Sequence, residues 1–170
     1  MKHYRIFKSR IGWVGLVWSK QKLLKLELPH TSKASAKTYL LKNHQQACIS
    51  SDNPQWVNGF VDKLSKYFDG ETVSFSSIPI DVSGMTEFQQ KVYAGARKIG
   101  YGKVVKYGDL AKAIGSAGAF RAVGGALGKN PVPIVVPCHR IMAANGIGGF
   151  SAPGGTTTKK VLLKLEGYTI

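Results

Sequence analysis

The side chains best suited to chemistry lie in one short segment, where Cys138 is followed directly by His139 and Arg140. A free thiol has a pKa of about 8.5, and a nearby cation or imidazole favours the reactive thiolate. Prolines within residues 131–137 make the backbone before the cysteine rigid, and residues 134–136 are predicted to be a short buried strand or extended run. The segment predicts a nucleophilic cysteine, and the alternative is an inert buried thiol.

A second unusual residue is Glu166, in the last turn of a predicted helix that ends at Gly167. A carboxylate at that position faces the negative end of the helix dipole, which is unfavourable by roughly 0.3–1 kcal/mol. A residue that breaks a local rule often marks a site. The alternative is a solvent-exposed glutamate paired with a lysine.

Three short helices are predicted ahead of the cysteine. The first follows Thr86, which has capping-box spacing to Gln89. The second covers residues 108–114, and the third covers residues 119–127, with Ser116 as a plausible start. Two helices joined by a tight glycine-containing connection are typical of a helix-turn-helix, and a plain helical hairpin is the alternative.

The first half of the chain predicts a mixed α/β unit. Apolar residues over 13–18 and alternating leucines over 24–28 indicate an antiparallel strand pair. Helices are predicted over residues 31–44 and 54–69, followed by a strand near residues 73–75. The Pro- and Gly-containing stretch that comes next is a candidate domain boundary, which divides the chain into residues 1–80 and 85–170.

Composition narrows the function classes. With 170 residues and 44% hydrophobic side chains the chain can bury a core, whereas no stretch of about 18 apolar residues predicts a membrane span. Its 24 Lys and Arg against 9 Asp and Glu give a net charge of +15, which favours a polyanion as partner, nucleic acid before membrane. Cationic residues that serve only solubility are the alternative.

The number of cysteines and the N-terminal residues indicate the cellular compartment of the protein. Cys48 and Cys138 are too few for a disulfide framework or a structural zinc site, so we expect a reducing, cytoplasmic environment and no metal. The first residues show no secretory signal.

Several blocks in the second half resemble one family. Residues 130–140, which end in Pro-Cys-His-Arg, resemble the active-site signature of the O6-alkylguanine-DNA alkyltransferases. Residues 121–126 resemble the recognition helix of that family, residues 105–111 the helix before it, and residues 149–151 and 163–167 its later motifs. The blocks occur in the family's order over about residues 86–168. The N-terminal half resembles the family only in position and in its strand-rich character.

The resemblance implies a fold and an activity. The fold would be α+β, with a ribonuclease H-like N-terminal domain and a mostly helical, winged-helix-like C-terminal domain containing the helix-turn-helix. The activity would be direct-reversal DNA repair: transfer of an alkyl group from guanine O6, and more weakly from thymine O4, to Cys138. The transfer would be irreversible, would need no cofactor and would occur once per molecule. The chain would act as a monomer on double-stranded DNA, with the damaged base flipped out of the stack.

The resemblance also assigns residues to DNA. The recognition helix would enter the minor groove, where small residues allow close approach, and Arg121 would fill the gap that the flipped base leaves. Glycines in a helix otherwise cost about 1 kcal/mol each, and close packing on a neighbouring helix is the alternative reason for them. The residues expected to bind DNA are Arg121, Ala122, Gly124, Gly125, Ala126 and Arg140.

Further residues are assigned to the reaction. By resemblance, Glu166 orients His139, which takes the thiol proton through a water molecule, and Asn130 ties the recognition helix to the active-site segment. Tyr107 would assist flipping and donate a proton to the leaving purine, although a core tyrosine is the alternative. The residues expected to bind the substrate base are Tyr107, Ile141, Phe150 and Ser151.

The sequence departs from the family pattern after Ser151, where Ala152 and Pro153 precede the expected glycine pair. The departure would stiffen or reshape the rim of the pocket, so we make no prediction about which sizes of alkyl group the pocket accepts. Two other classes of function are the alternatives. A non-catalytic damage sensor on the same scaffold would lack the reactive cysteine, and a Cys–His hydrolase of acyl substrates would need an oxyanion hole but no groove-binding helix.

Overall fold

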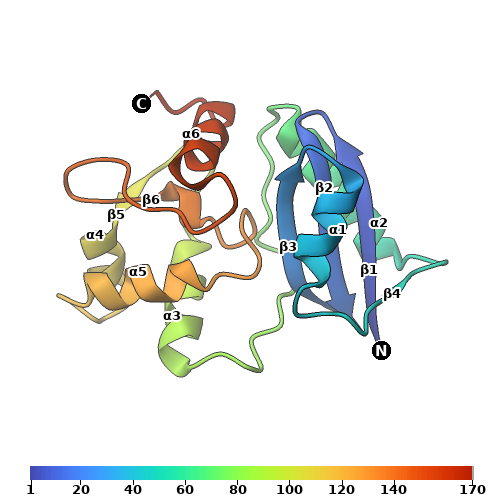
Figure 1. The fold of residues 1–170 in the computed structure, drawn as a ribbon. Helices are drawn as coiled ribbons and strands as arrows, with labels where there is room; N and C mark the ends of the chain where they lie inside the picture. The colour runs from blue at the N-terminus through green and yellow to red at the C-terminus, as the bar shows by residue number, and fades with distance from the viewer. Residues whose placement is uncertain (170) are drawn as a thin grey trace. The chain divides into compact units, whose positions relative to one another are not determined.

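The computed structural model describes residues 1–169, and the chain divides into two compact units after Asp81. Figure 1 shows a sheet with two helices in the N-terminal unit and a group of short helices in the C-terminal unit. Each unit has buried apolar residues of its own.

A four-stranded sheet forms the centre of the N-terminal unit, in the order β3-β2-β1-β4. Strands β1 (Lys2–Ser9), β2 (Gly12–Ser19) and β3 (Lys22–His30) are antiparallel neighbours, and the short β4 (Cys48–Ile49) runs parallel to β1. The predicted antiparallel pair is therefore confirmed. A left-handed backbone at Lys20, with φ of 53°, closes the tight turn between β2 and β3.

Two helices cover opposite faces of this sheet (Figure 1). Helix α1 (Lys33–Leu41) begins after Ser32, whose side chain accepts from the Ser35 N–H. It packs on the face that carries Tyr4 and Val17. Helix α2 (Gln55–Phe68) buries an apolar stripe, as its spacing predicts.

The strand predicted near residues 73–75 is wrong, because the chain there has no regular pairing. Pairing resumes further on, where Ile80 forms a parallel bridge with Leu23 of β3. The stretch expected to separate the domains thus begins as part of the N-terminal sheet.

The C-terminal unit begins with the helices α3, α4 and α5. Helix α3 (Glu87–Ala96) has the predicted capping box formed by Thr86 and Gln89. Helices α4 (Tyr107–Ala113) and α5 (Phe120–Gly128) follow, joined by a turn with left-handed glycines at 115 and 118. The start at Ser116 is wrong, since α5 begins only after Ala119.

Packing fixes this helix pair against α3. The Tyr93 hydroxyl of α3 donates to the Ala126 carbonyl of α5 at 2.9 Å in the core. A Cβ on Gly95 would lie 2.6 Å from the side chain of Ile114, so only glycine allows α3 and α4 to pack this closely.

After α5 the chain runs through a buried segment to a 3-10 turn at Cys138–Arg140. The strand or extended run predicted over residues 134–136 is wrong: Ile134 is left-handed, with φ of 71°, and a bridge joins Pro133 to Val136. A short strand β6 (Ile141–Met142) then pairs in parallel with β5 (Val105–Lys106), and α6 (Gly155–Leu165) ends the unit.

Candidate active site

A cavity of about 520 Å³ opens beside Cys138 in the C-terminal unit. Helices α4 and α5 form part of its wall, and the loop between β6 and α6 forms its rim. The residues that line it are Tyr107, Phe120, Gly124, Leu127, Gly128, Cys138, Ala143, Gly148, Gly149, Phe150 and Ser151. The cavity thus brings together residues that lie far apart in the sequence.

Cys138 is 8% exposed and is held by Asn130. The Asn130 amide donates to the Cys138 sulfur at 3.2 Å and to the Val136 carbonyl at 2.8 Å, while its oxygen accepts from the Val132 N–H at 3.0 Å. Burial raises the pKa of the Cys138 thiol, against the opposing effects of Asn130 and Lys159. The sulfur is therefore a protonated thiol at rest, and it needs a base before it can attack.

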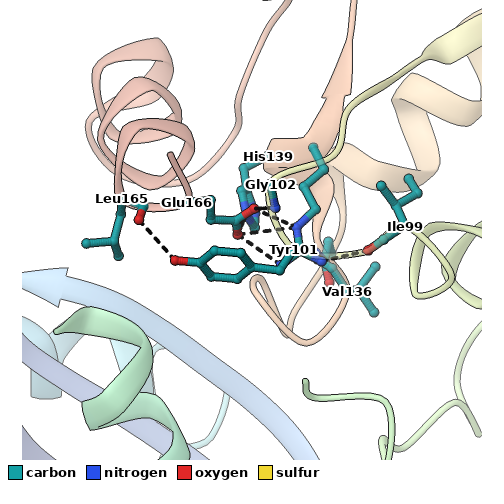
Figure 2. Close-up of polar contacts among 9 residues, drawn as sticks. Ile99, Tyr101, Gly102, Val136, His139, Leu165 and Glu166 are labelled. Carbon is teal, nitrogen blue, oxygen red and sulfur yellow. Dashed lines mark hydrogen bonds and ion pairs between the residues drawn. The ribbon is translucent and has the colours of Figure 1, made fainter. Parts of the chain in front are cut away.

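His139 is the candidate base. It is completely buried, and its Nε2 lies 2.6 Å from a carboxylate oxygen of Glu166 (Figure 2). A carboxylate only accepts, so Nε2–H is the donor and Nδ1 carries the lone pair. Burial lowers the pKa of His139, although Glu166 opposes this, and the imidazole is neutral near pH 7. A neutral imidazole can accept a proton.

Arg140 is buried rather than exposed, which corrects its assignment to DNA binding from the sequence. It is 6% exposed, and its guanidinium forms a bidentate salt bridge with the Glu166 carboxylate, in which both N–H···O distances are 2.9 Å. A third nitrogen donates to the Ile99 carbonyl at 2.6 Å. Its charge compensates the buried carboxylate, which is the usual requirement for burying an ion.

Glu166 is the centre of this network. It is 5% exposed, and it also accepts from the Gly102 N–H at 3.0 Å (Figure 2). Burial alone would raise its pKa, but hydrogen bonds from His139 and Arg140, the charge that His139 gains at low pH and the permanent charge of Arg140 lower the pKa of Glu166 to about 2. The carboxylate is thus ionised at neutral pH. The alternative reading as a solvent-exposed glutamate is wrong.

Lys159 was missed by the sequence analysis. It is fully buried, and its ammonium donates to the carbonyls of Ile141 and Gly149, the latter at 3.3 Å. It also lies 5.9 Å from the centre of the Tyr107 ring. Burial lowers the pKa of Lys159 to about 8, although Cys138 opposes the shift. A charged Lys159 favours the thiolate of Cys138.

Spacing within α6 could have revealed Lys159. Positions 159, 162, 163 and 166 have the 3, 4, 7 spacing of a buried helix stripe, and Leu162 and Leu163 fill its middle. A lysine and a glutamate at its two ends are charged residues at core positions. Such residues need partners or a function.

The remaining pocket residues lie at different depths. Tyr107 is half-buried in the cavity wall, and burial followed by the effect of Cys138 raises its pKa, so the phenol keeps its proton. Phe150 is half-buried, and Ser151 is exposed at the rim. The Ile141 carbonyl already accepts from Lys159, so an incoming base would have to share it.

Helix α5 presents only part of the predicted groove-binding set. Arg121, Ala122 and Gly125 are exposed, and Gly124 is half-buried next to the Tyr107 ring. Ala126 is 5% exposed and packs toward α3, which corrects its assignment to DNA. Helical geometry explains the difference, because Ala126 shares the inward face with Val123 and Leu127.

Two further findings concern membranes and metals. Among the helices of residues 1–169, none combines the length and hydrophobicity that a membrane-spanning segment requires. Within the same described residues, no three His, Cys, Asp or Glu side chains are grouped so that they could hold a metal ion.

A helix pair over a pocket with a buried cysteine, histidine and glutamate defines a class of protein: one that brings a cysteine nucleophile to a nucleic acid. Residues 87–168 match the family described as 6-O-methylguanine DNA methyltransferase, DNA binding domain. Residues 2–82 match the ribonuclease-like domain of the same family. The chain belongs to the 6-O-methylguanine DNA methyltransferase family.

Individual relatives are similar to this protein over almost its whole length. The methylated-DNA–protein-cysteine methyltransferase of Metallosphaera sedula is 36% identical and covers 100% of this chain and 96% of its own length. The crystal structure of Mycobacterium tuberculosis O6-methylguanine methyltransferase has a TM-score of 0.77 at 38% identity, over 98% of this chain and 93% of that chain. M. tuberculosis OGT in complex with DNA has a TM-score of 0.76 at 38% identity, over 96% and 92% of the two chains. The predicted family and α+β fold class are confirmed.

The network around Glu166 predicts a pH-dependent stability. Because its pKa falls from an ordinary value near 4.3 to about 2 on folding, Glu166 contributes stability that is complete above about pH 5 and is lost as the pH falls through about 2. We expect Glu166→Gln to lower the free energy of unfolding by about 3–5 kcal/mol at pH 7, since it leaves Arg140 buried without its counter-ion. The difference from the wild type should shrink below pH 4. Urea unfolding over a pH series measures it.

The matched control is Glu87→Gln, which removes an exposed ion pair with Lys91 in the same unit. It should leave the free energy of unfolding nearly unchanged at every pH. Equal losses in the two variants, or a Glu166→Gln loss that stays constant down to pH 2, would contradict the ionised network.

Proposed function

We propose that this methylated-DNA–protein-cysteine methyltransferase repairs O6-alkylguanine by transferring the alkyl group to Cys138. The observation that carries the proposal is the position of the Cys138 sulfur, on the cavity wall and directly before the buried His139–Glu166 pair. The other free cysteine, Cys48, lies exposed on β4 of the other unit and has no such neighbours.

The reaction follows from these groups. His139 accepts the thiol proton through a water molecule, and the sulfur attacks the alkyl carbon on guanine O6. The carbon–sulfur bond forms as the carbon–oxygen bond breaks, and the electron pair of the broken bond stays on the purine. Tyr107, which keeps its phenol proton, donates to the purine as this charge develops. The product thioether has no leaving step, so each molecule reacts once and needs no cofactor.

The cavity accepts a base but not a duplex, which supports flipping of the damaged nucleotide. Exposed Ala122 and Gly125 on α5 leave the helix backbone free to approach a minor groove, and Gly124 leaves room beside Tyr107. Arg121 is exposed on the same helix and would take the place of the flipped base. Ser151 at the rim would donate to the O6 side of the guanine, and Phe150 would pack on the base.

The proposal includes the setting of the reaction. A monomer would suffice, because every residue assigned to the chemistry comes from one unit of one chain. The partner is double-stranded DNA that contains O6-alkylguanine. The two free cysteines fit a reducing, cytoplasmic compartment. A non-catalytic damage sensor would have no use for a cysteine in this arrangement.

The acceptor can be tested by intact mass and peptide mapping after reaction with duplex O6-methylguanine DNA. One methyl group should appear on the peptide that contains Cys138 and none on Cys48. Cys138→Ala should abolish transfer and retain DNA binding, because the thiol is the nucleophile. Cys48→Ser is the matched control and should react as the wild type does. Methyl transfer by Cys138→Ala would refute the assignment.

Flipping and chemistry can be separated with O6-benzylguanine, a free base with no stack to leave. Extruding a base costs a few kcal/mol, so Arg121→Ala should slow repair of duplex DNA by a factor of ten or more and barely change reaction with the free base. Tyr107→Phe should slow both substrates, and the duplex more, since the phenol serves both steps. Single-turnover rates with the two substrates measure this. Equal slowing of both by Arg121→Ala would remove Arg121 from the flipping step.

A further inference from the structure

Charge is unevenly distributed within the N-terminal unit. Residues 1–51 carry ten Lys and Arg and a single acidic residue, Glu27, which is buried and paired with Lys25 and His30. Residues 52–81 carry two lysines and five acidic residues. A surplus of lysine that served only solubility would have no reason to separate in this way.

The separation follows the two faces of the sheet. Successive residues of a strand point to opposite faces, so Lys2 and Lys8 share the face of Tyr4, which α1 covers. On the opposite face Arg5 donates to Asn58 of α2, and Arg10 pairs with Asp69 just beyond it. The exposed lysines of the first face are Lys2, Lys8, Lys33, Lys37 and Lys42, which we call the α1 lysine face.

Two lysines on α1 itself are held in place without a counter-ion. The Lys33 ammonium lies 5.8 Å from the centre of the Trp13 ring, and the Lys37 ammonium lies 6.0 Å from that of Tyr4. Within residues 1–169 neither lysine forms an ion pair. An ammonium over a ring face keeps N–H groups for another acceptor.

Their position on the helix is unfavourable for stability. Lys33 is the first residue of α1 and Lys37 lies one turn later, while the first turn contains no acidic residue. A cation there faces the positive end of the helix dipole. A bound anion would remove this penalty, because helix N-termini and ammonium groups both favour negative charge.

We propose that the α1 lysine face binds the sugar–phosphate backbone of duplex DNA, as a second contact surface apart from the α5 site. The proposal rests on the proposed function only in taking DNA as the substrate. Five exposed lysines along one face match a row of phosphates, and duplex DNA presents such a row without sequence dependence. An anionic membrane fits less well. Within α1 the exposed residues beside Lys33 and Lys37 are Ala34 and Thr38, and Tyr39 is the one large ring that is exposed, whereas a helix that lies in a membrane surface carries a whole face of large apolar residues.

The test compares two charge-matched double variants of the full chain. K33Q/K37Q removes two charges from the α1 lysine face, and K63Q/K66Q removes two from α2 on the opposite face. Affinity for an undamaged duplex of about 30 base pairs is measured from 50 to 300 mM salt, by fluorescence anisotropy. K33Q/K37Q should bind more weakly at low salt, and its slope of log K against log salt should be smaller in magnitude by about 1–2. K63Q/K66Q should retain the wild-type slope.

Two more measurements separate the possible causes. K33R/K37R keeps both charges and should restore the slope, which would assign the effect to the charge of these residues rather than to the lysine side chain itself. All variants should react with free O6-benzylguanine at the wild-type rate. If the wild-type protein fails to react with O6-benzylguanine, the proposed function is refuted, but the comparison of salt slopes between the variants still tests the DNA surface.

Three outcomes would contradict the proposal that the α1 lysine face binds DNA. They are an unchanged slope in K33Q/K37Q, an equal change in K63Q/K66Q, and binding to vesicles of anionic phospholipid that K33Q/K37Q abolishes while its DNA slope stays at the wild-type value. The last result would assign the face to a membrane.

Discussion

The active site depends on one buried carboxylate. Glu166, at the end of α6, receives hydrogen bonds from His139 and Arg140 of the 3-10 turn and from the Gly102 backbone before β5. Segments that are distant in the sequence therefore all donate hydrogen bonds to the Glu166 carboxylate. Burial leaves the imidazole of His139 neutral and able to accept a proton, and the permanent charge of Arg140, which compensates the carboxylate, acts in the same direction. Without Arg140, the carboxylate would favour an already protonated histidine.

The burial of Cys138 controls when this nucleophile becomes reactive. The raised pKa of Cys138 keeps the thiol protonated in the resting protein, which protects an acceptor that can be used only once. Asn130 and Lys159 supply a hydrogen bond and a positive charge that favour the thiolate once the proton has left. A substrate that fills the cavity also excludes water, which strengthens these electrostatic effects.

Local rules predicted the parts of this structure that are set locally. Apolar spacing located α2, capping-box spacing located α3, and the glycine-containing connection indicated the helix pair α4–α5, while an apolar run located β2 and alternation located β3. Arg140 could not be assigned in the same way, because its partner is 26 residues away and the 3-10 turn directs it inward. Ala126 was wrongly assigned to DNA binding because the motif identifies a helix but does not show which of its residues face solvent. The buried Lys159 was detectable from its place in a helix stripe, and the left-handed Ile134 was not, since no local pattern favours that backbone in a β-branched residue.

The most direct test of this account is the single-turnover rate of Glu166→Gln with free O6-benzylguanine, which needs no DNA and no flipping. The amide keeps the shape of Glu166 but not the charge that orients and stabilises a protonated His139. The account predicts a rate lower by at least a factor of ten at pH 7, with much of the loss recovered at high pH, where the thiol ionises without the base, and with DNA affinity unchanged. A wild-type rate and pH profile in the folded variant would contradict the central role of Glu166.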